Sequence, residues 1–84
     1  MYTVYILECR DKTLYTGYTT KIDRRISEHN LSTSGAKYTA SRRPVKLVYY
    51  ESYPTQRLAM HREAEIKKLS RSQKLDLIKK SNGS

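Results

Sequence analysis

The sequence lacks tryptophan and phenylalanine and contains one cysteine, so its aromatic residues are eight tyrosines. The single cysteine, Cys9, excludes an internal disulfide framework and a zinc site built on several thiolates, and it indicates a reducing compartment. Cys9 stands in an apolar-rich run. We therefore expect a buried or partly buried packing residue at this position rather than a nucleophile.

Long apolar stretches are also missing. Glu8, Arg10 and Asp11 interrupt the N-terminal apolar run before a secretion signal is complete. No stretch is long enough to span a membrane, and no segment has the broad apolar face of a basic helix that binds a membrane surface. We expect a cytoplasmic protein without a membrane partner.

Acidic residues are few, because 8 Asp and Glu stand against 17 Lys and Arg and give a net charge of +9. Scattered carboxylates argue against a two-metal nuclease site, whereas one divalent ion held by one carboxylate remains compatible. The excess of cations favours a polyanionic partner, chiefly nucleic acid, bound through its phosphates. The cations are dispersed along the sequence and indicate no particular groove. A basic protein whose charge only prevents association is the plainer alternative.

The N-terminal third of the chain has the composition of a β-hairpin. Residues 2–9 (YTVYILEC) and 14–19 (LYTGYT) are rich in β-branched and aromatic side chains, and the turn-forming residues RDKT lie between them. Because side chains alternate along a strand, Tyr5 and Tyr15 share a face if the loop has three or five residues. A two-residue loop would put them on opposite faces, and the sequence leaves the register open.

The apolar residues of KIDRRISEHNL recur at helical spacing and predict a helix over about residues 21–31. Residues 45–52 (VKLVYYES) predict a third strand. The small, polar and basic segment 32–44 between them is expected to be a loop.

Two further helices are predicted after Pro54. Thr55 or Ser52 can cap the first of them, which would run as far as Ser70. Ser70 and Gln73 have the spacing of a capping box and would begin the second.

The fold class is therefore α+β, with a small, three-stranded, mainly antiparallel sheet flanked by three helices. A chain of 84 residues has room for one domain with one small core and for a site on an open surface. We expect that domain to span residues 1–80 and residues 81–84 to form a frayed tail.

Four segments occur in a recognisable order: TVYIL, LYTGYT, KIDRRISEHN and RLAMHREAEIKKL. Together they resemble the GIY-YIG nuclease domain, in particular its small stand-alone bacterial members of uncharacterised role, over about residues 1–80. Thr3-Val4-Tyr5 stands in place of Gly-Ile-Tyr, and Tyr15-Thr16-Gly17 stands in place of Tyr-Ile-Gly. Both tyrosines and the last glycine of the two motifs are kept, whereas the first glycine is not.

The resemblance implies a catalytic set of two tyrosines, an arginine, a histidine and a glutamate: Tyr5, Tyr15, Arg25, His29 and Glu63. Tyr15 would be the general base or its relay, with Tyr5 and His29 beside it. Arg25 would stabilise the charge that grows on the phosphate, and Glu63 would bind a single Mg²⁺ or Mn²⁺ ion.

Several alternatives stay open on the residues alone. Helical spacing does not separate Arg24 from Arg25, or Glu65 from Glu63; the resemblance alone selects one of each pair. A tyrosine on a half-buried strand and a histidine on a helix are often packing residues, and a helical glutamate often makes an ordinary ion pair. Tyr18 is expected to be an exposed packing residue.

The resemblance and the charge together suggest a metal-dependent endonuclease-like domain that hydrolyses phosphodiester bonds with water as the nucleophile. The partner would be nucleic acid, with DNA favoured over RNA. A nucleic-acid-binding module that keeps the fold and cuts weakly or not at all is the second interpretation. A protein-interaction adaptor is the third.

Overall fold

The computed structural model describes residues 1–31 and 42–82 of the chain. Its elements follow one another as expected: β1 (Tyr2–Glu8), β2 (Leu14–Thr19), α1 (Ile22–Leu31), β3 (Lys46–Tyr53), α3 (Gln56–Lys67) and α4 (Arg71–Asn82). The three strands form one antiparallel sheet in the order β2-β1-β3. The α+β prediction is confirmed, and the described residues contain three strands and three helices.

The hairpin register decides the question that the sequence left open. Leu7 lies opposite Tyr15 and Glu8 opposite Leu14, so five residues form the loop. The loop is closed by the Cys9 amide, which donates to the Thr13 carbonyl at 2.9 Å. With this odd-numbered loop, Tyr5 lies opposite Gly17 and shares a face of the sheet with Tyr15.

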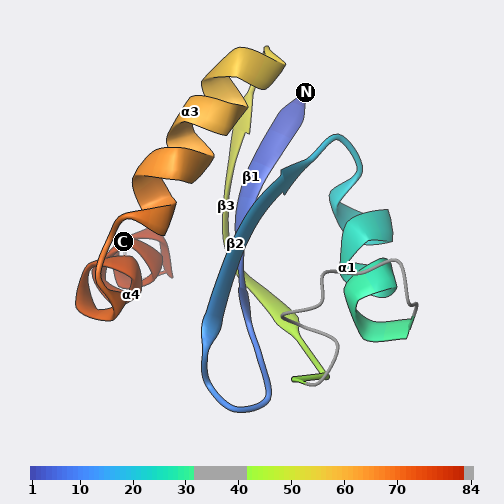
Figure 1. Cartoon of the computed structure of the whole chain (residues 1–84), viewed down its shortest axis with the longest axis vertical. Coiled ribbons are helices and arrows are strands. Elements are labelled where there is room, and N and C mark those ends of the chain that lie inside the picture. Colours follow the sequence, from blue (N-terminus) through green and yellow to red (C-terminus); the bar gives the residue numbers. More distant parts are fainter. Residues whose placement is uncertain (32–41, 83–84) are drawn as a thin grey trace.

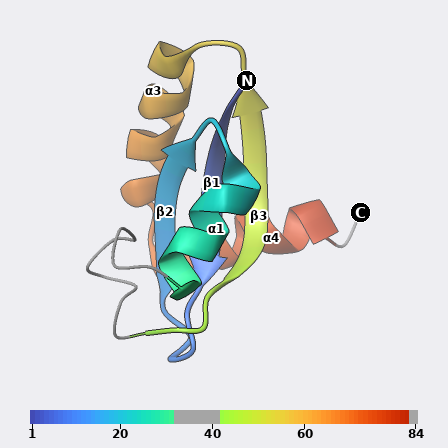
Figure 2. The same cartoon turned by 90° about the vertical axis from the view of Figure 1, so that its right-hand side faces the viewer.

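The central strand β1 is buried on both faces, which explains its continuous apolar sequence. Val4 and Ile6 face α3 and α4 and pack with Ala59 and Ile66. On the other face, α1 covers a second cluster of Tyr5, Leu7, Cys9 and Val45, against which Tyr15, Ile22 and Ile26 pack. Figures 1 and 2 show this three-layer arrangement, with α1 on one side of the sheet and α3 on the other.

The helix ends follow local capping chemistry. Thr55, not Ser52, caps α3, since its hydroxyl accepts from the Leu58 amide at 3.3 Å. The predicted capping box is present, because Ser70 and Gln73 exchange hydrogen bonds of 2.9 and 3.2 Å between amide and side chain. These bonds begin a new helix, so α3 ends before the predicted Ser70.

At the C-terminus, α4 continues through residue 82, two residues beyond the predicted domain boundary. The predicted loop falls on residues 32–44, of which 32–41 lie outside the described residues. None of the helices within the described ranges is both long and apolar enough to cross a membrane.

Candidate active site

Tyr5 and Gly17 form the floor of the candidate site. Tyr5 is 1 % exposed, so its polar hydroxyl is buried together with its ring. A Cβ atom added to Gly17 would lie 2.6 Å from the Tyr5 hydroxyl oxygen and 3.3 Å from Cε2 of Tyr15. The Tyr5 ring therefore passes against the backbone of β2 at Gly17, where only glycine leaves room for it.

His29 joins the two tyrosines from α1. Its side chain is fully buried, and its Nε2 atom lies 3.2 Å from the Tyr5 hydroxyl. The imidazole meets the rings of Tyr5 and Tyr15 edge to face, at centroid distances of 6.2 and 5.2 Å. His29 is thus both a packed residue and a member of the polar cluster.

Burial sets the protonation of this pair. Burial raises the pKa of the Tyr5 hydroxyl, and the neighbouring Arg25 guanidinium opposes that rise only in part. Burial and the Arg25 charge lower the pKa of His29. Both groups are therefore neutral near pH 7, and they share one hydrogen bond between the Tyr5 hydroxyl and Nε2 of His29.

Arg25 completes the polar chain on the same helix. Its guanidinium contacts the Tyr5 hydroxyl and donates from Nη1 to Oε1 of Glu28 at 3.2 Å. Burial works against the charge of Arg25, but the hydrogen bonds to Tyr5 and Glu28 outweigh it and raise its pKa. Arg24 instead points outward, since its side chain is 72 % exposed while that of Arg25 is 28 % exposed. The structure thus separates two arginines that helical spacing left equivalent.

Glu63 approaches the tyrosines from α3. Its side chain is 19 % exposed and lies 3.6 Å from Nζ of Lys67, one turn further along the helix. Its charge is close enough to contribute to the raised pKa of Tyr5. Glu65 is 54 % exposed and pairs with His61 and Arg62 instead. Glu63 is therefore the less exposed of the two glutamates and the one whose charge acts on Tyr5.

A polar hollow of about 250 Å³ opens beside this cluster, at the start of α1. It is lined by two threonines, one carboxylate and three cations: Thr19, Thr20, Glu28, Lys21, Arg24 and Arg25. Because Arg25 belongs to both the hollow and the tyrosine cluster, an anion in the hollow would reach the candidate catalytic groups.

Glu63 is the carboxylate that would hold a divalent ion. Within the described part of the chain, no three His, Cys, Asp or Glu side chains form a metal-binding group. Mg²⁺ typically takes one or two protein carboxylates and completes its shell with water and substrate phosphate oxygens. A single partly buried carboxylate fits that requirement, and one of its oxygens is paired with Lys67.

Two other predicted positions differ in their surroundings. Tyr18 lies opposite Val4, packs into the cluster under α3 and accepts from Gln56 Nε2 at 3.2 Å. It faces away from Tyr15 and is half-buried rather than exposed, because it sits an odd number of residues from Tyr15 on the same strand. Cys9 is 3 % exposed, as expected for a packing residue, and burial raises the pKa of its thiol.

A hydrogen-bonded network under α3 was missed by the sequence analysis. Glu51 on β3 accepts from Arg62 Nε at 2.9 Å and Nη2 at 3.1 Å, and from the hydroxyls of Tyr49 and Tyr53. These bonds hold the pKa of Glu51 low despite its burial, and burial together with Glu51 raises the pKa of Tyr49 to about 12. The alternation Tyr49-Glu51-Tyr53, which puts three polar groups on one strand face, was the available signal.

Asn30 is a second residue that the sequence analysis missed. Its side chain donates to the Val45 carbonyl at 3.0 Å and accepts from the Val45 amide at 2.7 Å. This pair of bonds fixes the end of α1 against the start of β3. It therefore helps to hold His29, the preceding residue, over the sheet.

The small antiparallel sheet carries two tyrosines on one face, which is covered by a helix with an Arg-His pair, and a glutamate comes from the opposite layer. Together these features define a nuclease-like class of α+β domain. Residues 1–76 match the model of the GIY-YIG catalytic domain, and the chain belongs to this family.

Close relatives share nearly the whole domain and carry the name UPF0213. A UPF0213 protein of Syntrophus aciditrophicus is 59 % identical over 78 residues, which are 93 % of this chain and 90 % of the relative. A relative in Staphylococcus haemolyticus is 56 % identical over 75 residues, or 89 % of this chain and 90 % of its own.

Two solution NMR structures resemble the fold. A UPF0213 protein of Bacillus halodurans is 51 % identical with a TM-score of 0.59, over 93 % of this chain and 83 % of that one. A protein of E. faecalis is 42 % identical with a TM-score of 0.67, over 99 % and 88 % of the two chains.

Proposed function

We propose that this domain is a metal-dependent endonuclease that hydrolyses phosphodiester bonds of nucleic acid. One observation supports the proposal: Tyr5, Tyr15, Arg25 and His29 form one cluster of contacts, and the charge of Glu63 acts on Tyr5. Tyr5 comes from β1, Tyr15 from β2, Arg25 and His29 from α1, and Glu63 from α3. A family match supports a nuclease-like reaction, and the net charge of +9 supports a polyanionic substrate.

The proposed step is an attack by water on phosphorus, with breakage of the bond to the leaving oxygen. Tyr15 is the more accessible of the two tyrosines and, as its phenolate, takes the water proton, directly or through a bridging water. The leaving oxygen takes up a proton from solvent to give the hydroxyl end. Arg25 binds a non-bridging phosphate oxygen and stabilises the negative charge that develops there. The products are a phosphate monoester and a hydroxyl end, so no covalent intermediate is required.

The remaining groups orient this apparatus. The hydrogen bond between the neutral His29 and Tyr5 fixes the tyrosine hydroxyl beside the Arg25 guanidinium. Glu63 would hold one Mg²⁺ or Mn²⁺ ion, which when bound supplies Lewis-acid polarisation of the phosphate and stabilises the leaving oxygen. DNA is the preferred substrate of the proposal, with RNA as the competing one.

The second candidate is a nucleic-acid-binding module that does not cut efficiently. One observation favours it, namely that the carboxylate of Glu63 is already paired with Lys67 at 3.6 Å. A metal ion would have to displace this ammonium group. The two candidates therefore differ in whether Glu63 exchanges Lys67 for a divalent ion when substrate binds.

Incubation of the purified protein with supercoiled plasmid and with single-stranded DNA and RNA oligonucleotides separates these candidates. Reactions contain Mg²⁺, Mn²⁺ or EDTA and compare wild type with Glu63→Gln and with the matched control Glu65→Gln. The proposal expects cleavage that EDTA and Glu63→Gln abolish and that Glu65→Gln leaves intact. No cleavage of any substrate, or unchanged cleavage by Glu63→Gln, would refute it. Binding without cleavage in both metals would establish the second candidate.

A Lys67→Gln variant sharpens the comparison. Removal of the competing ammonium should lower the metal concentration that gives half-maximal cleavage, with little change in fold because an i,i+4 pair contributes only about 0.5 kcal/mol. A higher metal requirement would mean that Lys67 assists the reaction, for example by contacting the phosphate.

A further inference from the structure

Cations that are far apart in the sequence gather at the hairpin-loop end of the sheet. Two belong to the loop between β1 and β2, two to the approach and start of β3, and two to the first turn of α4: Arg10, Lys12, Arg42, Lys46, Arg71 and Lys74. The acidic side chains paired with them are Glu8 and Asp11. We call this surface the basic end.

Direct contacts hold the three segments of the basic end together. The Arg10 amide donates to the Arg42 carbonyl at 2.9 Å, which joins the hairpin loop to the segment before β3. Arg71 Nη1 donates to the Lys12 carbonyl at 2.7 Å, which joins the same loop to α4. Lys12 adopts a positive φ of 71° in this loop. The fold therefore fixes the positions of the three backbone segments that carry these cations.

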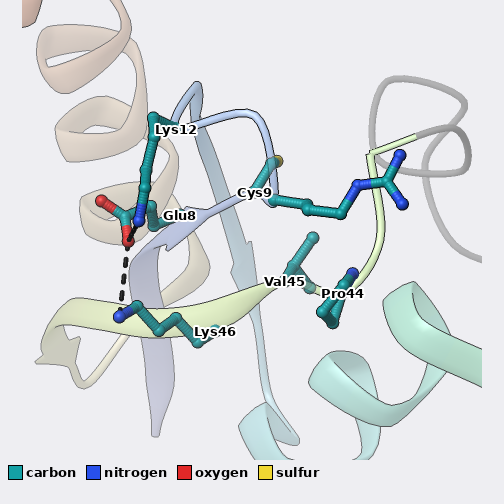
Figure 3. A pocket seen from close by; sticks show the side chains of 7 residues that line it. Glu8, Cys9, Lys12, Pro44, Val45 and Lys46 are labelled. Atoms are coloured by element: carbon teal, nitrogen blue, oxygen red, sulfur yellow. Dashed lines mark ion pairs between the residues drawn. The ribbon is translucent and has the colours of Figure 1, made fainter.

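A hollow of about 260 Å³ lies within the basic end. Its floor is apolar, formed by Cys9, Pro44 and Val45, and its rim carries Arg10, Lys12 and Lys46. Figure 3 shows Lys12 and Lys46 reaching Glu8 from two sides, at 3.9 and 3.4 Å. Both lysines are more than two-thirds exposed, so an incoming phosphate can attract them away from Glu8 at little cost.

The basic end adjoins the candidate active site along the strands. Thr13, two residues before Tyr15, lines a second hollow with Leu14, Arg71 and Lys74, of which Leu14 packs on the α3/α4 face of the sheet. Cys9 lies two residues beyond Leu7, the partner of Tyr15, which is about 7 Å along a strand. A polynucleotide bound at Tyr15 and continuing toward the hairpin loop would meet the basic end within its next few phosphates.

We propose that the basic end binds the phosphate backbone of the substrate strand on one side of the cleaved bond. This assignment rests on the proposed function, because it takes the strand at Tyr15 as its starting point. Charge complementarity carries it: six cations stand against two carboxylates at the loop end of β1 and β2, the strands that carry Tyr5 and Tyr15. The contacts are made to phosphates, so they add affinity and strand direction but little sequence preference.

A pair of matched triple variants tests the assignment. Arg10→Gln, Lys12→Gln and Lys46→Gln together remove three exposed cations from the basic end. Arg57→Gln, Lys79→Gln and Lys80→Gln remove three exposed cations elsewhere; α3, which carries Arg57, begins at the opposite end of the sheet (Figure 1). Circular dichroism first establishes that both proteins are folded.

Binding is measured in EDTA, so that it is independent of cleavage, by fluorescence anisotropy with labelled single-stranded and duplex DNA of about 20 nucleotides. At about 100 mM salt, the basic-end variant should bind at least about tenfold more weakly, and its slope of log K against log salt should be shallower by about two. The control variant should lose less than about threefold.

Hydrolysis of the small diester bis(p-nitrophenyl) phosphate, which is too short to reach the basic end, should be unchanged in the basic-end variant. Equal losses of binding in the two triple variants, no loss in either, or no binding by wild type would each overturn the assignment. Selective loss of binding in a protein that cleaves nothing would sustain the basic end as a binding surface and count against the nuclease proposal alone.

Discussion

The Tyr5 hydroxyl is the residue-scale centre of the candidate site. It contacts His29 on one side and Arg25 on the other, and it lies against the Gly17 backbone. Because Tyr5 is 1 % exposed, it is poorly placed to meet a substrate itself. Its role follows from its partners: it links the protonation of the buried histidine to the position of the arginine that faces the polar hollow.

A Gly17→Ala substitution tests this packing. The new Cβ would lie 2.6 and 2.8 Å from the Tyr5 Oη and Cζ atoms. These distances are too short for a van der Waals contact, so the ring or the strand must shift. We expect a loss of about 1–3 kcal/mol in the free energy of unfolding and a larger loss of cleavage, since the Tyr5 ring must move. Urea denaturation and a plasmid-cleavage assay measure the two effects. Unchanged stability would mean that β2 shifts freely at this point.

His29 should make stability depend on pH in the mildly acidic range. Its pKa is lowered in the folded protein, whereas the unfolded chain takes up a proton at about pH 6.5. The unfolded state then binds more protons, so stability is complete above about pH 6.5 and falls as the pH decreases toward the folded pKa. The slope can approach about 1.4 kcal/mol per pH unit.

Urea denaturation at a series of pH values between about 5 and 7.5 measures this slope. His29→Gln should abolish it, while His61→Gln, whose side chain is 79 % exposed in the wild type, should leave it unchanged. Glu51 and Asp11 also have lowered pKa values, but they start from 4.5 and 3.8 and act at lower pH. A flat wild-type profile in this window would contradict the neutral, buried state of His29.

Residue choices within the site could be predicted from the sequence only by resemblance. Arg24 and Arg25 are adjacent on a helix, and Glu63 and Glu65 flank the same apolar stripe, so periodicity gave no preference. The structure distinguishes the two arginines by exposure and by the contact of Arg25 with Tyr5. It distinguishes the two glutamates by exposure. Those differences depend on how α1 and α3 pack on the sheet, which is tertiary information.

At the scale of elements, α3 matters because it carries Glu63. Its attachment to β3 depends on Arg62, the neighbouring residue, which makes two hydrogen bonds to Glu51. Ala59 and Ile66 add apolar packing on the same side of the helix. The polar network therefore fixes the rotation of α3, and with it the direction in which Glu63 points.

Glu51→Gln should loosen this attachment. It leaves Arg62 and the hydroxyls of Tyr49 and Tyr53 without their shared carboxylate, at a cost of about 2–3 kcal/mol, less than for a fully buried pair because Arg62 is 30 % exposed. Cleavage should fall and require more metal, since Glu63 is no longer held in place. The control Glu65→Gln should change stability by less than about 0.5 kcal/mol.

The ion pair between Glu51 and Arg62 should also make stability depend on pH in the acidic range. The pKa of Glu51 is lowered on folding, so its contribution is present above its unfolded pKa of about 4.5 and is lost as the pH falls through the folded value. Wild type and Glu51→Gln should therefore converge in stability as the pH falls from about 4.5 through the lowered pKa of Glu51. A difference that stays constant through this fall would mean that lost packing, and not lost charge, destabilises the variant.

Most element boundaries could be predicted because local chemistry determines them. The Ser70–Gln73 capping box and the Thr55 cap are short-range features, and both occur. The hairpin register could not be predicted, because it depends on whether the loop has an odd or an even number of residues. The five-residue loop is stabilised by Asp11, whose carboxylate accepts from the amide and hydroxyl of Thr13, a detail that composition does not reveal.

At the scale of the whole molecule, the fold gathers charges that the sequence disperses. The hairpin loop, the segment before β3 and the first turn of α4 meet only because β1 is central in the sheet and α4 returns beneath the loop. Lys12 and Arg71 are separated by 59 positions and are joined by one hydrogen bond. Such a surface is invisible to a linear count of lysines and arginines, although the count indicates that a partner should be anionic.

The net charge of +9 should give salt opposite effects on folding and on binding. Like charges repel in the folded protein, so screening between about 20 and 200 mM salt should stabilise it by about 1 kcal/mol and raise Tm by about 4–8 °C. The same change should weaken nucleic-acid binding by about a hundredfold, because each phosphate contact releases a counterion. Thermal denaturation and anisotropy titrations across one salt series measure both. A Tm that falls with salt would show that the favourable ion pairs outweigh the net repulsion.

Both triple variants remove three cations and should flatten the salt dependence of Tm alike, whereas only the basic-end variant should flatten that of binding. That contrast separates the total charge, which acts on stability, from its placement by the fold, which acts on the substrate.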